Sequence, residues 1–415
     1  MIDSATNIYA IDLGNTYSAI AWVNPNTGLP EIIPDNETAE DKISSAVFFK
    51  EDGDILVGSE AEEEGGLQPD RLLKFYKRWI GRNSESRFFI DGEEKNPIML
   101  SAIILSKIKQ YAMQAGHDVR NVVLTCPVFY DWQQIHALKQ AGEIAGLNVQ
   151  SIVYEPSAAI MAYCRGHYDY DNKTILVFDL GGGKLDLSVY NVIPAEKKIV
   201  NIQQIVSEGN PMVGGIDWTQ KLLEVFQKKY IDKYGIEWND KLHSQIRVAA
   251  DNQKRKLSLR RSTLLRVIDP ICGQKIELEV TREEFERASV QLLDIIKTHI
   301  DSVQKRTNIA LDKQIDKVLL VGRATLMPMI QNLLIKQFGD KIIMNPDAIV
   351  KGAAIIANMD DDVLKEKSMW LAYPYTINKD ILGMRAVYAP PRMINEDDED
   401  EAWMSLVYAP PKFMK

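Results

Sequence analysis

The sequence predicts an α/β protein whose two lobes arise from a duplicated domain. Residues 8–14 form a short apolar run that ends in Asp-Leu-Gly, and residues 174–183 repeat this pattern much later in the chain. After each copy, apolar and polar residues alternate, over residues 17–23 and 185–190. Alternation around a glycine-rich turn is typical of a β-hairpin. Two such hairpins among helical segments favour the α/β class.

Further strands and helices are predicted from Pro and Gly residues that end apolar runs and from the spacing of apolar residues. Two apolar runs, at residues 121–127 and 317–322, end in proline or glycine, which predicts buried strands. In other stretches the Leu, Ile and Val residues recur at intervals of three and four, which predicts amphipathic helices packed on sheets. These stretches are residues 102–115, 131–145, 218–234 and 282–307.

Length and composition indicate an ordinary globular protein. A chain of 415 residues is too long for one core, so two or more lobes are expected. The N-terminus carries neither a basic run nor a long apolar stretch, so we expect a cytoplasmic protein without a membrane span. Cys126, Cys164 and Cys272 are far apart and odd in number, which favours buried free thiols. A net charge of −9 argues against a general nucleic-acid binder.

The end of the chain differs in character. Residues 359–415 contain acidic runs and the pentapeptide Val-Tyr-Ala-Pro-Pro twice, at residues 387–391 and 407–411. We therefore expect an acidic tail and no folded domain. The repeats are either recognition elements for a protein partner or strands that pack back on the lobes.

The two glycine-rich turns predict a nucleotide site between the lobes. Glycine allows backbone N–H groups to approach phosphate oxygens closely. Asp12 and Asp179 end the two strands before these turns, and phosphates would repel them unless Mg²⁺ lay between. Two ordinary hairpins without a ligand are the alternative.

An ordered set of motifs resembles the nucleotide-binding domain of the heat-shock protein 70 family. The resemblance implies a two-lobed actin-like ATPase fold of duplicated ribonuclease H-like domains, with ATP or ADP and Mg²⁺ in a central cleft. It places lobe I at about residues 1–173 and 339–358, and lobe II at about 174–338. The motifs lie at residues 11–18, 77–82, 154–159, 178–183, 321–322, 345–347 and 352–354.

The resemblance also implies site residues. Lys77, Glu155, Asp179 and Asp12 would serve catalysis, and the two aspartates would hold Mg²⁺ through water. Without the resemblance, Lys77 would be a surface helix lysine. The nucleotide would be bound by Gly14, Asn15, Thr16, Gly181, Gly182, Gly183, Lys184, Gly214, Gly215, Asp251, Lys254, Arg255, Ser258, Gly322, Arg323 and Asp347. For the helix that carries residues 250–258, a solvated face is the alternative.

Several positions depart from the family pattern. Lys184 stands where the family has threonine, so it either pairs with the terminal phosphate or blocks the site. Asn15 replaces a threonine of the first turn. Arg323 and Leu326 replace a glycine and the stacking arginine of the adenosine turn, and Ile135 stands at the place of a relay arginine. These changes bear on turnover and base selectivity.

The function that follows is an ATP-binding and ATP-hydrolysing switch that acts through a partner protein or co-chaperone. Too few residues remain after residue 358 for a peptide-binding domain of the family type. The alternatives are a nucleotide-binding scaffold with little turnover, an actin-like filament protein, and a sugar or acetate kinase. No second-substrate signature supports the kinase.

Overall fold

The computed structural model describes most of the chain up to residue 373. The described residues are 7–35, 38–66, 68–82, 88–166, 172–194, 200–236, 238–269, 273–359 and 371–373. They belong to one compact unit, Met1–Pro374. The unit Tyr375–Lys415, with both pentapeptide repeats, lies outside the described residues, as does Cys272.

Two sheets share one topology, which is the structural form of the predicted duplication. In both, a three-stranded antiparallel meander continues through its first strand into two parallel strands. The first sheet runs β3 (Pro30–Ile32), β2 (Tyr17–Val23), β1 (Ile8–Leu13), β10 (Asn121–Cys126) and β11 (Asn148–Tyr154). The second runs β14 (Val200–Asn210), β13 (Leu185–Pro194), β12 (Lys173–Leu180), β17 (Lys317–Val321) and β18 (Ile342–Met344).

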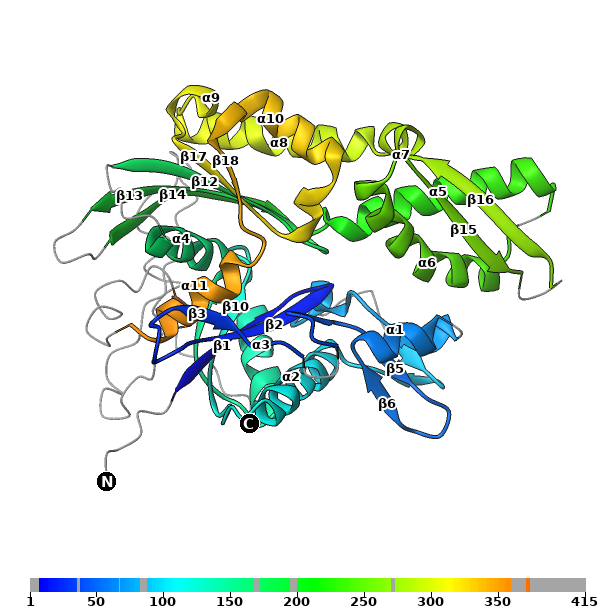
Figure 1. Ribbon diagram of the computed structural model, residues 1–415, viewed down its shortest axis with the longest axis horizontal. Coiled ribbons are helices and arrows are strands. Elements are labelled where there is room, and N and C mark those ends of the chain that lie inside the picture. Colours follow the sequence, from blue (N-terminus) through cyan, green and yellow to red (C-terminus); the bar gives the residue numbers. More distant parts are fainter. Residues whose placement is uncertain are drawn as a thin grey trace, which may run out of the picture. The chain divides into compact units, whose positions relative to one another are not determined.

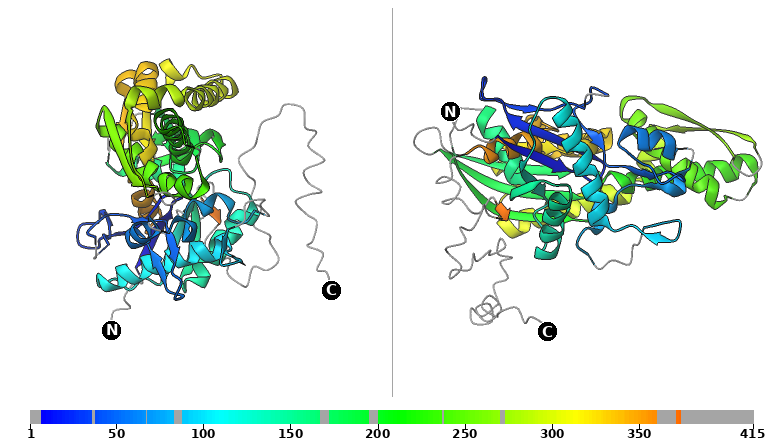
Figure 2. Two further views of the ribbon diagram at one scale, coloured as in Figure 1. Left: turned by 90° about the vertical axis from the view of Figure 1, so that its right-hand side faces the viewer. Right: turned by 90° about the horizontal axis from the view of Figure 1, so that it is seen from below.

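Two helices lie between the sheets (Figure 1). They are α4 (Glu155–Gly166) and α11 (Ala348–Ala357), and their apolar residues share a core with both sheets. They cross closely at Gly352, where an added Cβ would lie 1.7 Å from the carbonyl oxygen of Ala158. The left view of Figure 2 shows the same order, with the blue and cyan elements below and the green and yellow ones above.

Other helices cover the outer faces of the sheets. On β1, Tyr9, Ile11 and Leu13 pack into a core with α2 (Pro97–Gln114) and α3 (Trp132–Ile144). On β12, Leu176 and Phe178 pack with α8 (Val290–Thr307) and α10 (Pro328–Phe338). Because successive strand residues face opposite sides, each sheet separates the central helix pair from an outer helix layer.

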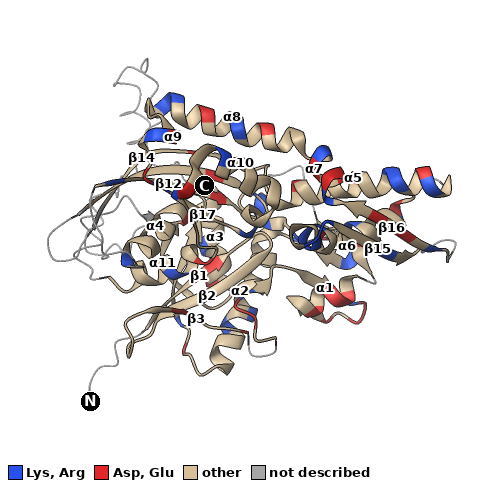
Figure 3. Ribbon diagram, turned by 45° about the horizontal axis from the view of Figure 1, so that its top comes forward, with Lys and Arg blue, Asp and Glu red and all other residues tan. Residues whose placement is uncertain are grey.

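The remaining elements complete each half. The first half adds β4 (Ile43–Ser44), β5 (Val47–Phe49), β6 (Ile55–Val57), α1 (Ser59–Gly65), η1 (Pro69–Arg71), β7 (Leu72–Leu73), η2 (Tyr76–Trp79), β8 (Phe89–Ile90) and β9 (Glu93–Glu94). The second adds α5 (Gly215–Tyr234), α6 (Asp240–Leu259), β15 (Ser262–Ile268), β16 (Lys275–Thr281), α7 (Arg282–Ala288), α9 (Leu311–Gln314), η4 (Arg323–Leu326) and η5 (Gly339–Lys341). Acidic and basic residues are interspersed along α5 and α8 (Figure 3).

The predicted helices are present, with one difference. Residues 282–307 form two helices, α7 and α8, and not one. The break lies at Ser289, whose backbone dihedrals (φ −96°, ψ 1°) depart from the helix. Periodicity missed this break because the apolar spacing continues across it.

Two short strands differ from the predicted boundaries. β18 pairs with β17 in the second sheet, although residues 339–358 were assigned to lobe I. β19 (Leu371–Tyr373) pairs antiparallel with β11, although it lies in the predicted tail. The acidic residues 360–362 suggested that folded structure had ended, but the apolar triplet after them extends the first sheet.

Two further expectations concern chemistry and membranes. Cys126 and Cys164 are buried, as predicted, and Cys126 is a free thiol. None of the described helices has the length and hydropathy that a bilayer span requires.

Candidate functional site

A cleft of about 620 Å³ opens where the two hairpin turns meet. Its volume lies within the range of about 300–1,000 Å³ that is typical of small-molecule sites. Every predicted site residue except Gly214 and Asp347 lines it. The lining residues of the predicted set are Asp12, Gly14, Asn15, Thr16, Lys77, Glu155, Asp179, Gly181, Gly182, Gly183, Lys184, Gly215, Asp251, Lys254, Arg255, Ser258, Gly322 and Arg323.

The first turn is held by serine hydroxyls. The backbone N–H of Gly14 donates to Oγ of Ser18 (3.2 Å), and Ser45 donates to the carbonyl of Gly14 (2.8 Å). A Cβ on Gly14 would lie 2.1 Å from the carbonyl oxygen of Tyr17, so only glycine fits this turn. Beside it, Oδ1 of Asn15 is buried and has no hydrogen-bond partner among the described residues. This oxygen can therefore accept a hydrogen bond from a ligand.

The second turn rests on the N-terminus of α5. The N–H groups of Gly215 and Ile216 donate to the carbonyls of Gly181 and Gly182, both at 2.9 Å. Gly214 packs so closely under the turn that a Cβ would lie 2.5 Å from the carbonyl carbon of Gly183. Gly214 therefore shapes the turn from outside the cleft. The positive end of the α5 dipole points at this turn, an arrangement that favours anions.

The two turns contact each other at the cleft. A Cβ on Gly182 would lie 1.8 Å from Oγ1 of Thr16, and one on Gly183 would lie 1.7 Å from Nδ2 of Asn15. Arg78 links the two lobes at the same place, because its Nε donates to the carbonyl of Gly183 (2.7 Å). Its Nη2 also pairs with Asp217 of α5 (2.6 Å).

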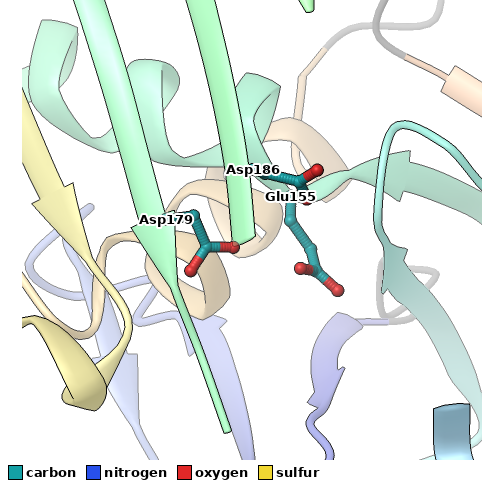
Figure 4. Close-up of side chains that lie close together, drawn as sticks. All are labelled: Glu155, Asp179 and Asp186. Carbon is teal, nitrogen blue, oxygen red and sulfur yellow. The ribbon is translucent and has the colours of Figure 1, made fainter. Parts of the chain in front are cut away.

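Buried carboxyl groups gather beneath the turns. Asp12 ends β1 and accepts a hydrogen bond from Thr125 (2.8 Å). Burial and then the nearby Glu155 raise the pKa of Asp12 to about 6. Asp179 ends β12 and lies opposite Asp186 of β13. Figure 4 shows these two aspartates close to Glu155, the first residue of α4.

Two buried lysines neutralise part of this charge. Nζ of Lys77 lies 3.5 Å from Glu155, and the side chain is only 5% exposed, which excludes the surface position. Nζ of Lys184 lies 2.8 Å from Glu155 and 2.6 Å from Asp179. It also contacts Asp186. Burial alone would raise the pKa of Glu155, but Lys184 and Lys77 hold it below its usual value, so Glu155 stays ionised at neutral pH.

The other end of the cleft is built by α6 and η4. Asp251 pairs with both Lys254 (2.8 Å) and Arg255 (2.6 Å), and Ser258 follows one turn later. Lys254 is buried and also donates to the carbonyl of Gly215 (2.7 Å), so this face of α6 is packed and not solvated. It ties the helix to α5.

Two arginines flank one aromatic ring at this end. The guanidinium groups of Arg255 and Arg323 lie 5.3 and 5.7 Å from the ring centroid of Tyr17. Gly322, just before Arg323, has a φ of +79° that favours glycine. Asp347 lies outside the cleft and pairs with Lys42 (2.7 Å).

The sequence prediction did not include four residues that shape the site, namely Tyr17, Arg78, Asp186 and Asp217. Asp186 could have been found, because alternation along the second hairpin puts it on the same side as Asp179. Arg78 and Asp217 meet only through the tertiary fold, so no local signal indicated them.

A family comparison is consistent with this geometry. The model of the Hsp70 protein family matches residues 8–373. The chain belongs to the Hsp70 family. Members of this family are ATP-binding chaperones with the actin-like ATPase fold, so the predicted family and fold are confirmed.

Relatives named chaperone protein DnaK match along most of the chain. The protein from Thermotoga petrophila is 34% identical over 86% of this chain, that from Thermosipho melanesiensis 34% over 84%, and that from Thermosipho africanus 32% over 86%. The match covers 60%, 59% and 60% of these relatives, so the chain spans about three fifths of their length.

Proposed function

We propose that this chain binds ATP and ADP across the cleft and works as a nucleotide-dependent switch. The observation that carries the proposal is the meeting of the turns at Gly14–Thr16 and Gly181–Gly183, one from each lobe. A phosphate chain bound between them would touch both lobes at once. Its binding and release would therefore change how the lobes are held together.

The phosphate end offers donors and a favourable dipole. Backbone N–H groups of the turns and the N-terminus of α5 favour an anion. Arg78 would lie close to the phosphates, because it contacts the second turn and α5. In this way the terminal phosphate would stabilise contacts between the lobes.

The nucleoside end is proposed to lie at α6 and η4. Arg255 and Arg323 can stack on a base as they do on Tyr17, because a guanidinium is planar and weakly hydrated. Asp251, Lys254 and Ser258 would meet the ribose. Arg323 and Leu326 make this end different from the family pattern, so they would set the selectivity for the base.

ATP hydrolysis is a second candidate activity. Lys77 would stabilise charge on the terminal phosphate, which is the main work that phosphoryl transfer needs. Asp12, with a pKa of about 6, is suited to accept a proton from water at neutral pH. Lys184 favours the rival, a scaffold with little turnover, because it ties Glu155 and Asp179 in ion pairs.

The output of the switch would go to a partner protein. The relatives are named chaperones, and such a protein would need a client or co-chaperone to act on. The repeats at residues 387–391 and 407–411 remain candidate partner contacts. A cytoplasmic location and the absence of nucleic-acid binding remain predictions.

Calorimetric titration with ATP and ADP, followed by a phosphate-release assay, tests the proposal. We expect binding of both nucleotides, and a hundredfold excess over Kd should stabilise the fold by about 2.7 kcal/mol. Lys77→Ala should reduce phosphate release by about 10² to 10³ while affinity changes far less. Lys109→Ala, outside the cleft on α2, is the matched control. If neither nucleotide binds, the proposal is wrong and only the family and fold stand.

A further inference from the structure

The ammonium group of Lys184 lies among three buried carboxylates. Its Nζ is 2.8 Å from Glu155 and 2.6 Å from Asp179, and it also contacts Asp186. The side chain of Lys184 is 12% exposed, and the carboxylates are 5% exposed or less. An ammonium has three N–H donors. Three carboxylates therefore match its full bonding capacity, which leaves no donor for a phosphate.

The second hairpin creates the need for this cation. Asp179 and Asp186 lie directly opposite each other on β12 and β13, where like charges destabilise a sheet. The first hairpin has no such conflict, because Ala19 lies opposite Asp12. Lys184 lies two residues before Asp186, and its ammonium group pairs with both aspartates. Burial alone would lower the pKa of Lys184, but Asp179, Asp186 and Glu155 raise it well above its usual value, so the cation is permanent.

The same three carboxylates have the geometry of a cation site. One oxygen from each lies within 4.8 Å of the others, close enough to ligate a single metal ion. Mg²⁺ prefers such oxygens. With the Lys184 ammonium among them, a divalent ion would meet a positive charge and would find Asp179 already paired. The residues present therefore do not fit Mg²⁺ at Asp179, one of the two aspartates at which the resemblance predicted it.

We propose that Lys184 is a built-in cation that replaces a divalent metal and makes nucleotide binding by this chain independent of Mg²⁺. The proposal rests on the proposed function, since it concerns the same phosphate end. Lys184 neutralises the acids that would repel the phosphates, and it does not grip the phosphates itself. Together with Lys77 it offsets most of the negative charge on the cluster of Glu155, Asp179 and Asp186, in which burial raises the pKa of Asp186 to about 7.

Titration of ATP in excess EDTA and again in Mg²⁺ tests this proposal. For the wild type we expect the two Kd values to agree within about threefold. Lys184→Thr removes the counter-charge that Lys184 gives to the three carboxylates and makes room for an ion. Its affinity in EDTA should fall by at least about tenfold, and Mg²⁺ should restore it. Lys184→Arg keeps the charge and should stay independent of Mg²⁺.

Binding of Mn²⁺ without nucleotide provides a separate readout by electron paramagnetic resonance. Lys184→Thr should bind one Mn²⁺ at concentrations where the wild type binds none at this cluster, and Asp186→Asn in the Lys184→Thr background should weaken that binding. Wild type that binds ATP only with Mg²⁺ would overturn the proposal and leave the proposed function intact. If ATP binds under neither condition, the proposed function fails, and the Mn²⁺ comparison still decides whether Lys184 occupies a metal position. If Lys184→Thr fails to fold, binding of one Mn²⁺ at this cluster by the wild type would overturn the proposal, whereas no binding there by either wild type or Lys184→Arg would support it.

Discussion

Substituting Gly352 with alanine tests how the two halves are joined. Gly352 lies on α11 where this helix crosses α4. A Cβ there would lie 1.7 Å from the carbonyl oxygen of Ala158 and 2.5 Å from its carbonyl carbon, whereas ordinary contact begins at 3.4 Å. Both obstacles are backbone atoms, so no side-chain rotation relieves them. The helices would have to move apart by about 1.7 Å, half of the normal contact distance.

The expected sign of the effect is unusual for this exchange. In a helix, alanine is more favourable than glycine by about 1 kcal/mol. Overpacking a tight core costs about 1–3 kcal/mol and occasionally more. Because the clash is severe and the crossing belongs to the core shared by both sheets, we expect the upper part of that range. The net result is a loss of about 2 kcal/mol in the free energy of unfolding.

Urea unfolding followed by far-ultraviolet circular dichroism measures this loss. The urea midpoint of Gly352→Ala should fall without a change in slope, since a changed slope would indicate altered compactness. Gly215→Ala, measured without nucleotide, is the control, because a Cβ there meets its nearest neighbours at 3.5 Å. An unchanged or higher midpoint for Gly352→Ala would refute the close crossing and with it our account of how α4 and α11 join the sheets.

Three further predictions concern the cleft. Asp12→Asn removes a carboxyl whose pKa rises from 3.8 to about 6 on folding, so wild type loses stability relative to the variant as pH rises through that window. In urea unfolding, the variant's free energy of unfolding should be higher by about 3 kcal/mol above pH 6 and equal to that of wild type below pH 3.8. Arg78→Ala removes a contact between the lobes, so it should increase the radius of gyration in X-ray scattering and weaken ATP binding. The control Arg120→Ala, at an exposed arginine, should change neither, and an unchanged radius of gyration for Arg78→Ala would contradict its linking role. Arg323→Gly should weaken ATP binding about three- to tenfold, because the base would lose its stacking contact with the guanidinium that lies over Tyr17. Binding of inorganic triphosphate, which has no base, should not change. Tighter ATP binding by the variant would show that Arg323 fills the base pocket.

Local patterns were sufficient to predict the framework. The hairpins around Gly14 and Gly181 follow from apolar runs, alternation and glycine, all of which act over a few residues. The position of β10 follows in the same way from the apolar run before Pro127. The repeated sheet topology follows once both hairpins are placed, because each first strand pairs with the next parallel strand on its other side.

What the sequence left open depends on contacts between distant segments. The sequence allowed Lys184 either to hold a phosphate or to block the site, and its carboxylate partners come partly from α4, about thirty residues earlier. Tyr17 receives two arginines from α6 and η4, which no periodicity indicates. β19 is only three residues long, too short for a strand signal after an acidic run.

The two duplicated hairpins stabilise their buried aspartates, Asp12 and Asp179, in different ways, and this difference affects how the switch would work. Asp12 is supported by a neutral hydroxyl from Thr125 on the neighbouring strand, within one sheet. Asp179 is supported by a charge from Lys184, which also pairs with Glu155 beyond β11 of the other sheet. Lys184 of the second lobe therefore pairs with Glu155 of the first lobe. In the opposite direction, Arg78 of the first lobe donates to the carbonyl of Gly183 in the second lobe. Lys184 and Arg78 thus both make charged contacts between the lobes. A bound phosphate chain would act on these contacts and would either strengthen the Arg78 contact or weaken the Lys184 contact. Comparing the scattering curves of Lys184→Thr and Arg78→Ala with and without ATP would show which of the two links the nucleotide controls.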